Sequence, residues 1–136
     1  MRFTTIIFVA IFLVLMIGCS RKTQVSGKVT FDDGSTLTVG EVRFESAGFL
    51  ASGKIQSDGT YRLGSVSKSD GVPKGSYKVS IFAMDESGNK PGMPLVNVPV
   101  PKSLVAEKYR SGETSGLVCE VNGSTTFDIT VEKPKQ

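Results

Sequence analysis

The sequence predicts an all-β protein: an antiparallel Greek-key β-sandwich of about seven short strands, preceded by an N-terminal hydrophobic signal segment. Three observations support this class. Apolar and polar residues alternate in several short segments. Turn signals rich in Gly, Asp, Asn and Pro separate these segments about every ten residues. No segment after the leader has the pattern of an amphipathic helix.

The first predicted strands are short and amphipathic. Apolar and polar residues alternate over Val25–Phe31, and the turn signal Asp32-Asp33-Gly34 follows. A second strand is predicted over Glu41–Glu45, with Val42 and Phe44 pointing inward. Both segments therefore have one apolar face for a shared core.

Turn chemistry defines the next unit, Gly53–Leu63. Ser57-Asp58-Gly59 is typical of a three-residue hairpin loop with Gly59 in the left-handed conformation. This loop pairs Ile55 with Tyr61, and Gly53 with Leu63, so the large apolar groups share one face.

The strongest predicted strand is Tyr77–Ala83, which follows the turn Val72-Pro73-Lys74-Gly75. The chain closes with predicted strands at Leu117–Val121 and Thr125–Val131. A two-residue hairpin at Asn122-Gly123 would put their apolar rows on opposite faces. We therefore expect an odd-length hairpin loop that places Phe127 and Ile129 on the face of Leu117 and Cys119.

Three segments are predicted to be loops. Ser46–Ser52 is apolar without a clear period, and Gly64–Gly71 is polar and rich in serine. Met84–Gly116 contains four of the six prolines, which exclude a central strand. A connection of this length is typical of a functional loop or a crossover between sheets. Within it, Ser103–Tyr109 is compatible with a single helical turn.

The N-terminus has the pattern of a lipoprotein signal. Arg2 precedes 12 apolar residues, Ile6–Ile17, and Met16-Ile17-Gly18-Cys19 follows the order of a lipoprotein cleavage site. This run suits a signal peptide and is shorter than the roughly 18 residues that span a bilayer. Cleavage between Gly18 and Cys19 would leave an acylated Cys19 as the membrane anchor. An uncleaved anchor and an ordinary secretory signal are the alternatives.

These features divide the chain into a signal peptide (1–18), a lipidated tether (19–24), a β-sandwich domain (25–132) and a tail (133–136). Two or three acyl chains on one cysteine hold a protein stably on a membrane. Ser20 follows the cysteine where Asp would retain a Gram-negative lipoprotein at the inner membrane. We therefore expect a lipid-anchored protein of the cell envelope, at the outer membrane and facing the periplasm.

Four parts of the chain carry a family resemblance: Val25–Phe31 (VSGKVTF), Ser57–Leu63 (SDGTYRL), Val72–Val79 (VPKGSYKV), and Glu107–Arg110 (EKYR) with Thr114–Leu117 (TSGL). In order and spacing they resemble the carboxypeptidase regulatory-like, transthyretin-like domains of small bacterial lipoproteins. The resemblance covers most of residues 25–131 and implies a prealbumin-like sandwich without catalytic activity. The sequence departs from the family pattern at Ser65–Asp70, which looks like an insertion, and at the short turn Asn122-Gly123.

Lys108, Tyr109 and Arg110 are the most prominent candidate binding residues. They could grip an acidic polymer or a lipid headgroup. Alternatively, Tyr109 plugs the open end of the sandwich while its two basic neighbours stay in water. Both interpretations can be tested by the position of the Tyr109 ring.

Other ligand chemistries have weaker support. Carbohydrate binding needs an aromatic platform, but there is no tryptophan and Tyr61 and Tyr77 belong to predicted inner rows. Calcium needs several oxygen donors with the spacing of a calcium loop. The available carboxylates instead follow turn chemistry, and they are Asp32, Asp33, Asp58, Asp70, Asp85 and Glu86. We therefore expect no metal and no cofactor.

Composition argues against catalysis and against nucleic-acid binding. The chain contains no histidine, so Ser-His and Cys-His nucleophile systems are excluded. Cys119 lies in an apolar row and is expected to be buried, and we expect no catalytic residue. The net charge of +3 is spread along the chain without a basic block.

The sequence thus predicts a non-catalytic envelope module with a binding or structural role. Its expected partners are membrane lipid, through acylated Cys19, and an unknown envelope protein or polysaccharide. The alternative is a carbohydrate- or calcium-binding lipoprotein that uses the Met84–Gly116 loop.

Overall fold

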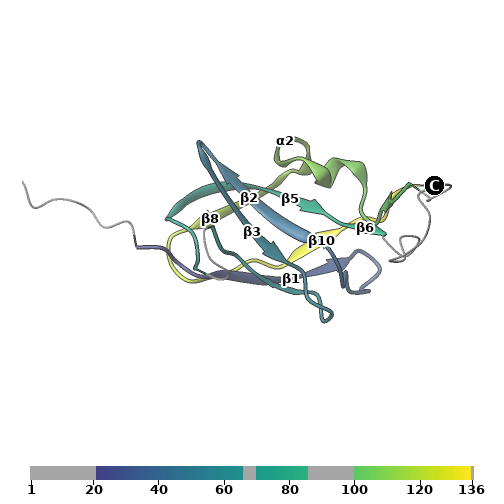
Figure 1. Ribbon diagram of the computed structural model, residues 1–136, viewed down its shortest axis with the longest axis horizontal. Helices are drawn as coiled ribbons and strands as arrows, with labels where there is room; N and C mark the ends of the chain where they lie inside the picture. The colour runs from purple at the N-terminus through teal and green to yellow at the C-terminus, as the bar shows by residue number, and fades with distance from the viewer. Residues whose placement is uncertain (1–20, 66–69, 86–99, 136) are drawn as a thin grey trace, which may run out of the picture.

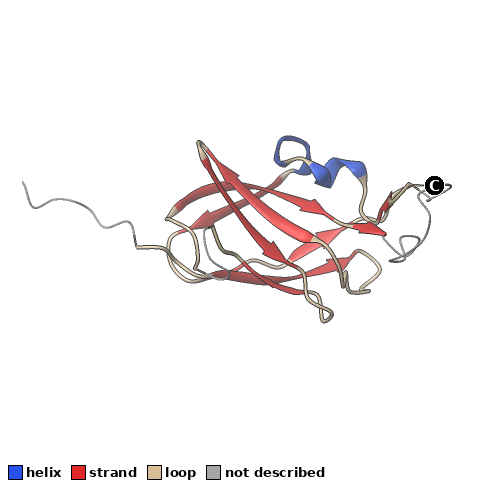
Figure 2. Ribbon diagram, viewed as in Figure 1, coloured by secondary structure: helices blue, strands red, loops and turns tan. Residues whose placement is uncertain are grey.

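The computed structural model describes residues 21–65, 70–85 and 100–135, which form two facing β-sheets around one hydrophobic core (Figure 1; Figure 2). Each sheet has four strands, and a two-stranded ribbon and two single-turn helices lie beside them. The predicted all-β sandwich is confirmed.

The first sheet is built around β1 (Val25–Phe31). β4 (Thr60–Arg62) pairs with β1 in antiparallel orientation. β9 (Thr125–Thr126) and β10 (Ile129–Val131) pair with β1 in parallel orientation, with Val25 opposite Thr125 and Val29 opposite Ile129. The expectation of purely antiparallel pairing is therefore corrected for this sheet.

The second sheet is antiparallel throughout, in the order β3-β2-β5-β8. Its inward side chains alternate along the strands as predicted, and Val42, Phe44, Tyr77, Val79 and Ile81 are at most 3% exposed. The strand bounds are β2 Glu41–Ser46, β3 Phe49–Lys54, β5 Gly75–Phe82 and β8 Leu117–Val121.

β3 overturns the loop expected at Ser46–Ser52. This segment forms a tight hairpin with β2, in which Ser46 pairs with Phe49 across the turn Ala47-Gly48. Gly48 has φ 73°, a left-handed conformation that glycine adopts without steric cost. The inward row of β3 holds one large residue, Phe49, followed by the small Ala51 and Gly53, and the apolar Leu50 points outward, so the strand period is obscured. That is why alternation fails to reveal it.

The predicted Ser57-Asp58-Gly59 turn is confirmed. The amide of Gln56 donates to the carbonyl of Thr60 at 2.8 Å, and Gly59 has φ 82°. The bridge between Ser52 and Gly64 keeps the predicted register. The strands on either side nevertheless belong to different sheets, so this unit is a corner between the sheets and not a continuous hairpin.

The hairpin predicted between Leu117–Val121 and Thr125–Val131 is wrong. β8 pairs with β5, and residues 122–124 then cross to the first sheet, where β9 and β10 pair with β1. Ile129 is 2% exposed and Phe127 packs against the core, so both still face the side predicted from their pattern. The alternating pattern indicates which face of a strand is buried, but it does not indicate which strand it pairs with.

Gly27 permits a close approach between β1 and the final segment. A Cβ at this position would lie 1.9 Å from the carbonyl oxygen of Phe127. The Tyr61 hydroxyl donates to the same carbonyl at 2.6 Å. The ring of Phe44 lies 6.0 Å from the Phe127 ring, edge to face. These contacts join the two sheets at the centre of the core.

The long predicted loop contains more order than expected. β6 (Met84–Asp85) and β7 (Lys102–Ser103) form a short ribbon. The predicted helical turn is present as η1 (Glu107–Arg110), and α2 (Gly112–Ser115) follows it. In the described ranges, 21–65, 70–85 and 100–135, we find no helix with the length and apolar character needed to cross a membrane.

Candidate functional site

The helical segment η1–α2 lies against the outer face of the second sheet (Figure 2). Ser115 donates its hydroxyl to the carbonyl of Val79 on β5, and Lys78 forms an ion pair with Glu113 at 2.6 Å. Ser80 is only 3% exposed although it lies in the outward row of β5. This part of the sheet face is therefore covered by the chain itself.

The three candidate binding residues separate into one core residue and two surface residues. Tyr109 is 6% exposed, whereas Lys108 and Arg110 are exposed, as the structural interpretation of this motif expects. Lys108 pairs with Glu132, just after β10. This hydrogen bond raises the pKa of Lys108 and lowers the pKa of Glu132. The motif thus ties η1 to the end of the first sheet.

The carboxylates considered for calcium mostly serve their own turns. Asp33 accepts hydrogen bonds from Ser35 and pairs with Lys133, and these contacts hold its pKa far below the usual range. Asp58 accepts from the amide and hydroxyl of Thr60, which also lowers its pKa. Across residues 21–65, 70–85 and 100–135, no three His, Cys, Asp or Glu side chains group as a metal site. Glu86 lies outside these residues.

The tyrosine rings offer no platform for a sugar. The chain has three tyrosines, and Tyr61, Tyr77 and Tyr109 are 1%, 3% and 6% exposed. Burial raises the pKa of both Tyr61 and Tyr77. All three rings belong to the core.

Cys119 is buried as predicted. Its side chain is 2% exposed in β8 and is not part of a disulfide. Burial raises the pKa of the thiol, which disfavours the nucleophilic thiolate. The geometry makes Cys119 a packing residue of the core.

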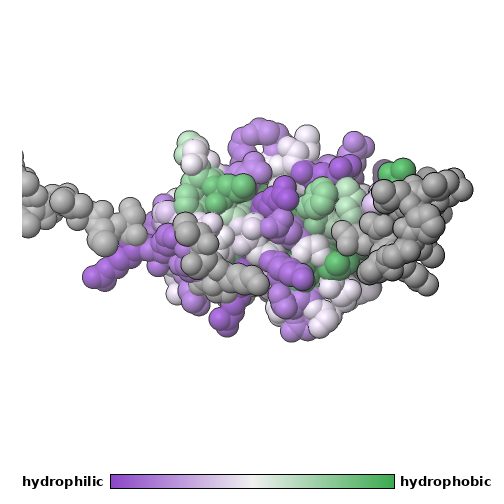
Figure 3. Space-filling view, viewed as in Figure 1, coloured by the Kyte–Doolittle hydropathy of each residue, from purple (hydrophilic) through white to green (hydrophobic). Residues whose placement is uncertain are grey.

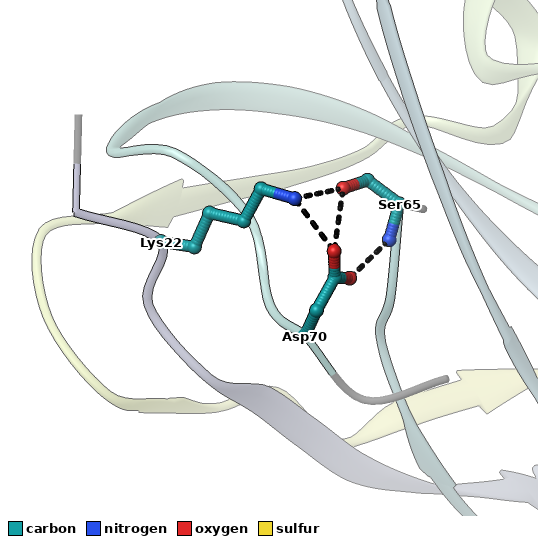
Figure 4. A network of polar contacts seen from close by, with 3 residues as sticks. All are labelled: Lys22, Ser65 and Asp70. Carbon is teal, nitrogen blue, oxygen red and sulfur yellow. Dashed lines mark hydrogen bonds and ion pairs between the residues drawn. The ribbon is translucent and has the colours of Figure 1, made fainter. Parts of the chain in front are cut away.

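The start of the described chain is fastened to the sandwich by two sets of polar contacts. Thr23 and Val72 exchange backbone hydrogen bonds of 2.7 and 2.9 Å. Lys22 pairs with Asp70 at 2.6 Å, and both contact Ser65 (Figure 4). These contacts hold together Ser65 and Asp70, the two ends of the predicted insertion. Sequence reasoning missed them because no local pattern links residues almost fifty positions apart.

We call the end of the sandwich that holds Thr23 the tether end. It comprises Thr23, the turn Val72–Gly75 and the β2–β3 turn Ala47-Gly48. The purple start of the described chain and the β2–β3 turn lie at the same end in Figure 1. The predicted lipidation site, Cys19, and the cleavage residue Gly18 lie outside the described residues.

Comparison with known proteins gives one structural similarity. No protein-family model and no curated protein matches the chain. A crystal structure of a DUF3823 family protein from Bacteroides ovatus is similar, with 21% identity and a TM-score of 0.43. The similarity covers 81% of this chain and 44% of that one, so the present chain spans less than half of that protein's length.

Proposed function

We propose that this protein is a non-catalytic, lipid-anchored module of the cell envelope with a binding or structural role. The observation that carries the proposal is the short distance in sequence between the predicted acylation site and the fold. The hydrogen-bonded sandwich begins at Thr23, four residues after Cys19. Such an arrangement suits a domain held close to a membrane surface.

The candidate residues Lys108 and Cys119 are paired or buried within the domain, and this supports a non-catalytic role. Lys108 is paired with Glu132, and the Cys119 thiol is buried with a raised pKa. The resemblance to carboxypeptidase regulatory-like lipoprotein domains agrees with this role. Ser20, at the place where Asp would retain a Gram-negative lipoprotein at the inner membrane, favours the outer membrane, facing the periplasm, as the location.

The alternative, a carbohydrate- or calcium-binding lipoprotein, has less support. The described part of the Met84–Gly116 segment directs Val105 and Tyr109 into the core. Asp33 and Asp58 are engaged in their own turns. An envelope protein or a polysaccharide that contacts the free surface of the sandwich therefore remains our proposed partner, beside membrane lipid.

Metabolic labelling with an alkyne analogue of palmitate tests the anchor. The full chain, Cys19→Ala and Cys119→Ala are expressed in a Gram-negative host and purified after labelling. We expect label on the full chain and on Cys119→Ala, which retains the acylation site, and none on Cys19→Ala. Unlabelled full chain, or label that persists in Cys19→Ala, would overturn the proposal.

Membrane fractionation tests the location. The labelled full chain should sediment with outer-membrane vesicles after a detergent-free wash. Ser20→Asp should shift it to the inner-membrane fraction without changing the label. Equal distribution of the two proteins would contradict the outer-membrane assignment.

A further inference from the structure

The tether end exposes apolar side chains on a protruding turn. Ala47 and Gly48 are exposed at the β2–β3 turn, and Leu50 is 56% exposed beside them. Residues 47–51 carry no charge. In Figure 3, green apolar surface gathers near this end of the second sheet, close to purple surface where the described chain starts. Apolar side chains next to basic ones are typical of segments that lie in a membrane interface.

This apolar turn is connected to the start of the described chain through a series of contacts. The half-buried ring of Phe49 packs edge to face on Tyr77, with 6.1 Å between ring centroids. The Tyr77 hydroxyl donates to the carbonyl of Pro73 at 2.8 Å. Pro73 follows Val72, which binds Thr23. The position of the turn relative to the start of the chain is thus fixed by packing and hydrogen bonds.

The chain length keeps this end near the bilayer, an argument that rests on the proposed acylation of Cys19. Three residues, Ser20 to Lys22, separate Cys19 from Thr23. A fully extended chain spans at most about 3.6 Å per residue, so Thr23 lies within about 14 Å of the acylated cysteine. This reach keeps Thr23, and with it the tether end, close to the membrane surface.

Charge at the same end suits an anionic surface. Arg21 and Lys74 are exposed, and Lys22 is 36% exposed although it pairs with Asp70. Lysine and arginine beside a bilayer are attracted to its anionic headgroups. The apolar turn therefore has basic residues on the neighbouring segments, and one exposed carboxylate, Glu45, lies opposite Leu50 in the same hairpin.

We propose that the tether end is a lipid-docking surface. Ala47, Gly48 and Leu50 enter the headgroup region of the membrane that holds Cys19, while Arg21 and Lys74 contact anionic headgroups. The anchor thus fixes an orientation as well as a location, with the opposite end of the sandwich pointing away from the membrane.

Two fluorescent probes test this orientation. The lipidated full chain carrying Cys119→Ala is labelled with an environment-sensitive dye at Ala47→Cys or, as the matched control, at Ser57→Cys in an exposed turn of the opposite end. Each protein is inserted into phosphatidylethanolamine–phosphatidylglycerol vesicles. We expect a blue-shifted emission at position 47 and several-fold stronger quenching there by brominated lipid than at position 57.

Three other results are possible, and each contradicts lipid docking, the lipid anchor or both. Equal, water-like emission at both positions on vesicles that retain the protein would refute docking and leave the anchor intact. Loss of the protein from the vesicles on washing would refute the anchor too. A blue shift at position 47 that needs no lipid and grows with protein concentration would assign the surface to a second copy of the chain.

Leu50→Ser provides a second test. Because Leu50 is exposed, the fold should persist, as checked by circular dichroism. Quenching at position 47 should fall at least about twofold while the protein remains on the vesicles. Unchanged quenching would contradict insertion of this turn.

Discussion

The two ends of the sandwich close with different chemistry. At the tether end, Phe49 packs on Tyr77 and the turn Ala47-Gly48 is exposed and apolar. At the opposite end, which we call the far end, Asp33 and Asp58 accept hydrogen bonds within the turns Asp32–Ser35 and Ser57–Thr60. Turns of the far end are suited to water, because their carboxylates are exposed and ionised.

The difference shows how one small domain can present two kinds of surface at its two ends. Both ends use tight turns with a left-handed glycine, Gly48 at one end and Gly59 at the other. The turns differ in length, with two residues at Ala47-Gly48 and three at Ser57–Gly59, and in the side chains that they carry.

The largest expected effect breaks the packing between β1 and the final segment. A methyl group added by Gly27→Ala would meet the Phe127 carbonyl oxygen at 1.9 Å, so the strands must separate. We expect a loss of about 3 kcal/mol in the free energy of unfolding, measured by urea denaturation. The control is Gly123→Ala, where an added Cβ meets nothing within 4 Å. Equal stability of the two variants would contradict this contact.

A smaller effect should be confined to the tether end. Tyr77→Phe removes the hydrogen bond to the Pro73 carbonyl and leaves the ring in place. We expect a loss of about 1 kcal/mol in the free energy of unfolding. Hydrogen exchange should also show faster exchange of the Thr23 and Val72 amides, with no change in the turn around Asp33. A uniform increase across both ends would mean that this hydroxyl does not hold the tether end locally.

The smallest effect should appear at the far end and should depend on pH. The contacts with Lys133 and Ser35 lower the pKa of Asp33, so they stabilise the fold while the carboxylate is ionised. This contribution is present above the ordinary pKa of about 3.9 and is lost as the pH falls further. Asp33→Asn should therefore lower the denaturation midpoint slightly at pH 7, and the difference should shrink as the solution becomes more acidic than about pH 4.

The control for Asp33→Asn is Asp32→Asn, which removes the adjacent charge and keeps the Asp33–Lys133 pair. Because both side chains are exposed, neither variant should alter the fold. If the two variants had the same pH dependence, the ion pair would not be the source of the effect.

Much of the fold follows from local patterns in the sequence. Alternation identifies β1, β2, β5 and β8, and glycine chemistry identifies the Ser57-Asp58-Gly59 turn. β3 is missed because its inward Ala51 and Gly53 are small and the exposed Leu50 is apolar, which hides the alternation. The parallel pairing of β1 with β9 and β10 could not be predicted either. Val29 and Ile129 are a hundred positions apart, and alternation within a strand does not indicate its pairing partner.

The candidate site could be predicted only in part. The apolar pattern around Cys119 predicts its burial, which is confirmed, and the Tyr109 ring is buried while its place at the open end of the sandwich stays a prediction. The tether end could not be predicted from the sequence, because the contact between Thr23 and Val72 is tertiary. The exposure of Leu50 likewise depends on the direction of a strand that the sequence does not mark.

Mass spectrometry of the N-terminal peptide from the purified, membrane-extracted protein tests the central claim most directly. We predict a mature chain that begins at Cys19 and carries a diacylglyceryl group on its sulfur, followed by unmodified Ser20. A chain that still begins at Met1, or one that starts at a free Cys19 thiol, would contradict lipid anchoring and with it the proposed orientation of the sandwich.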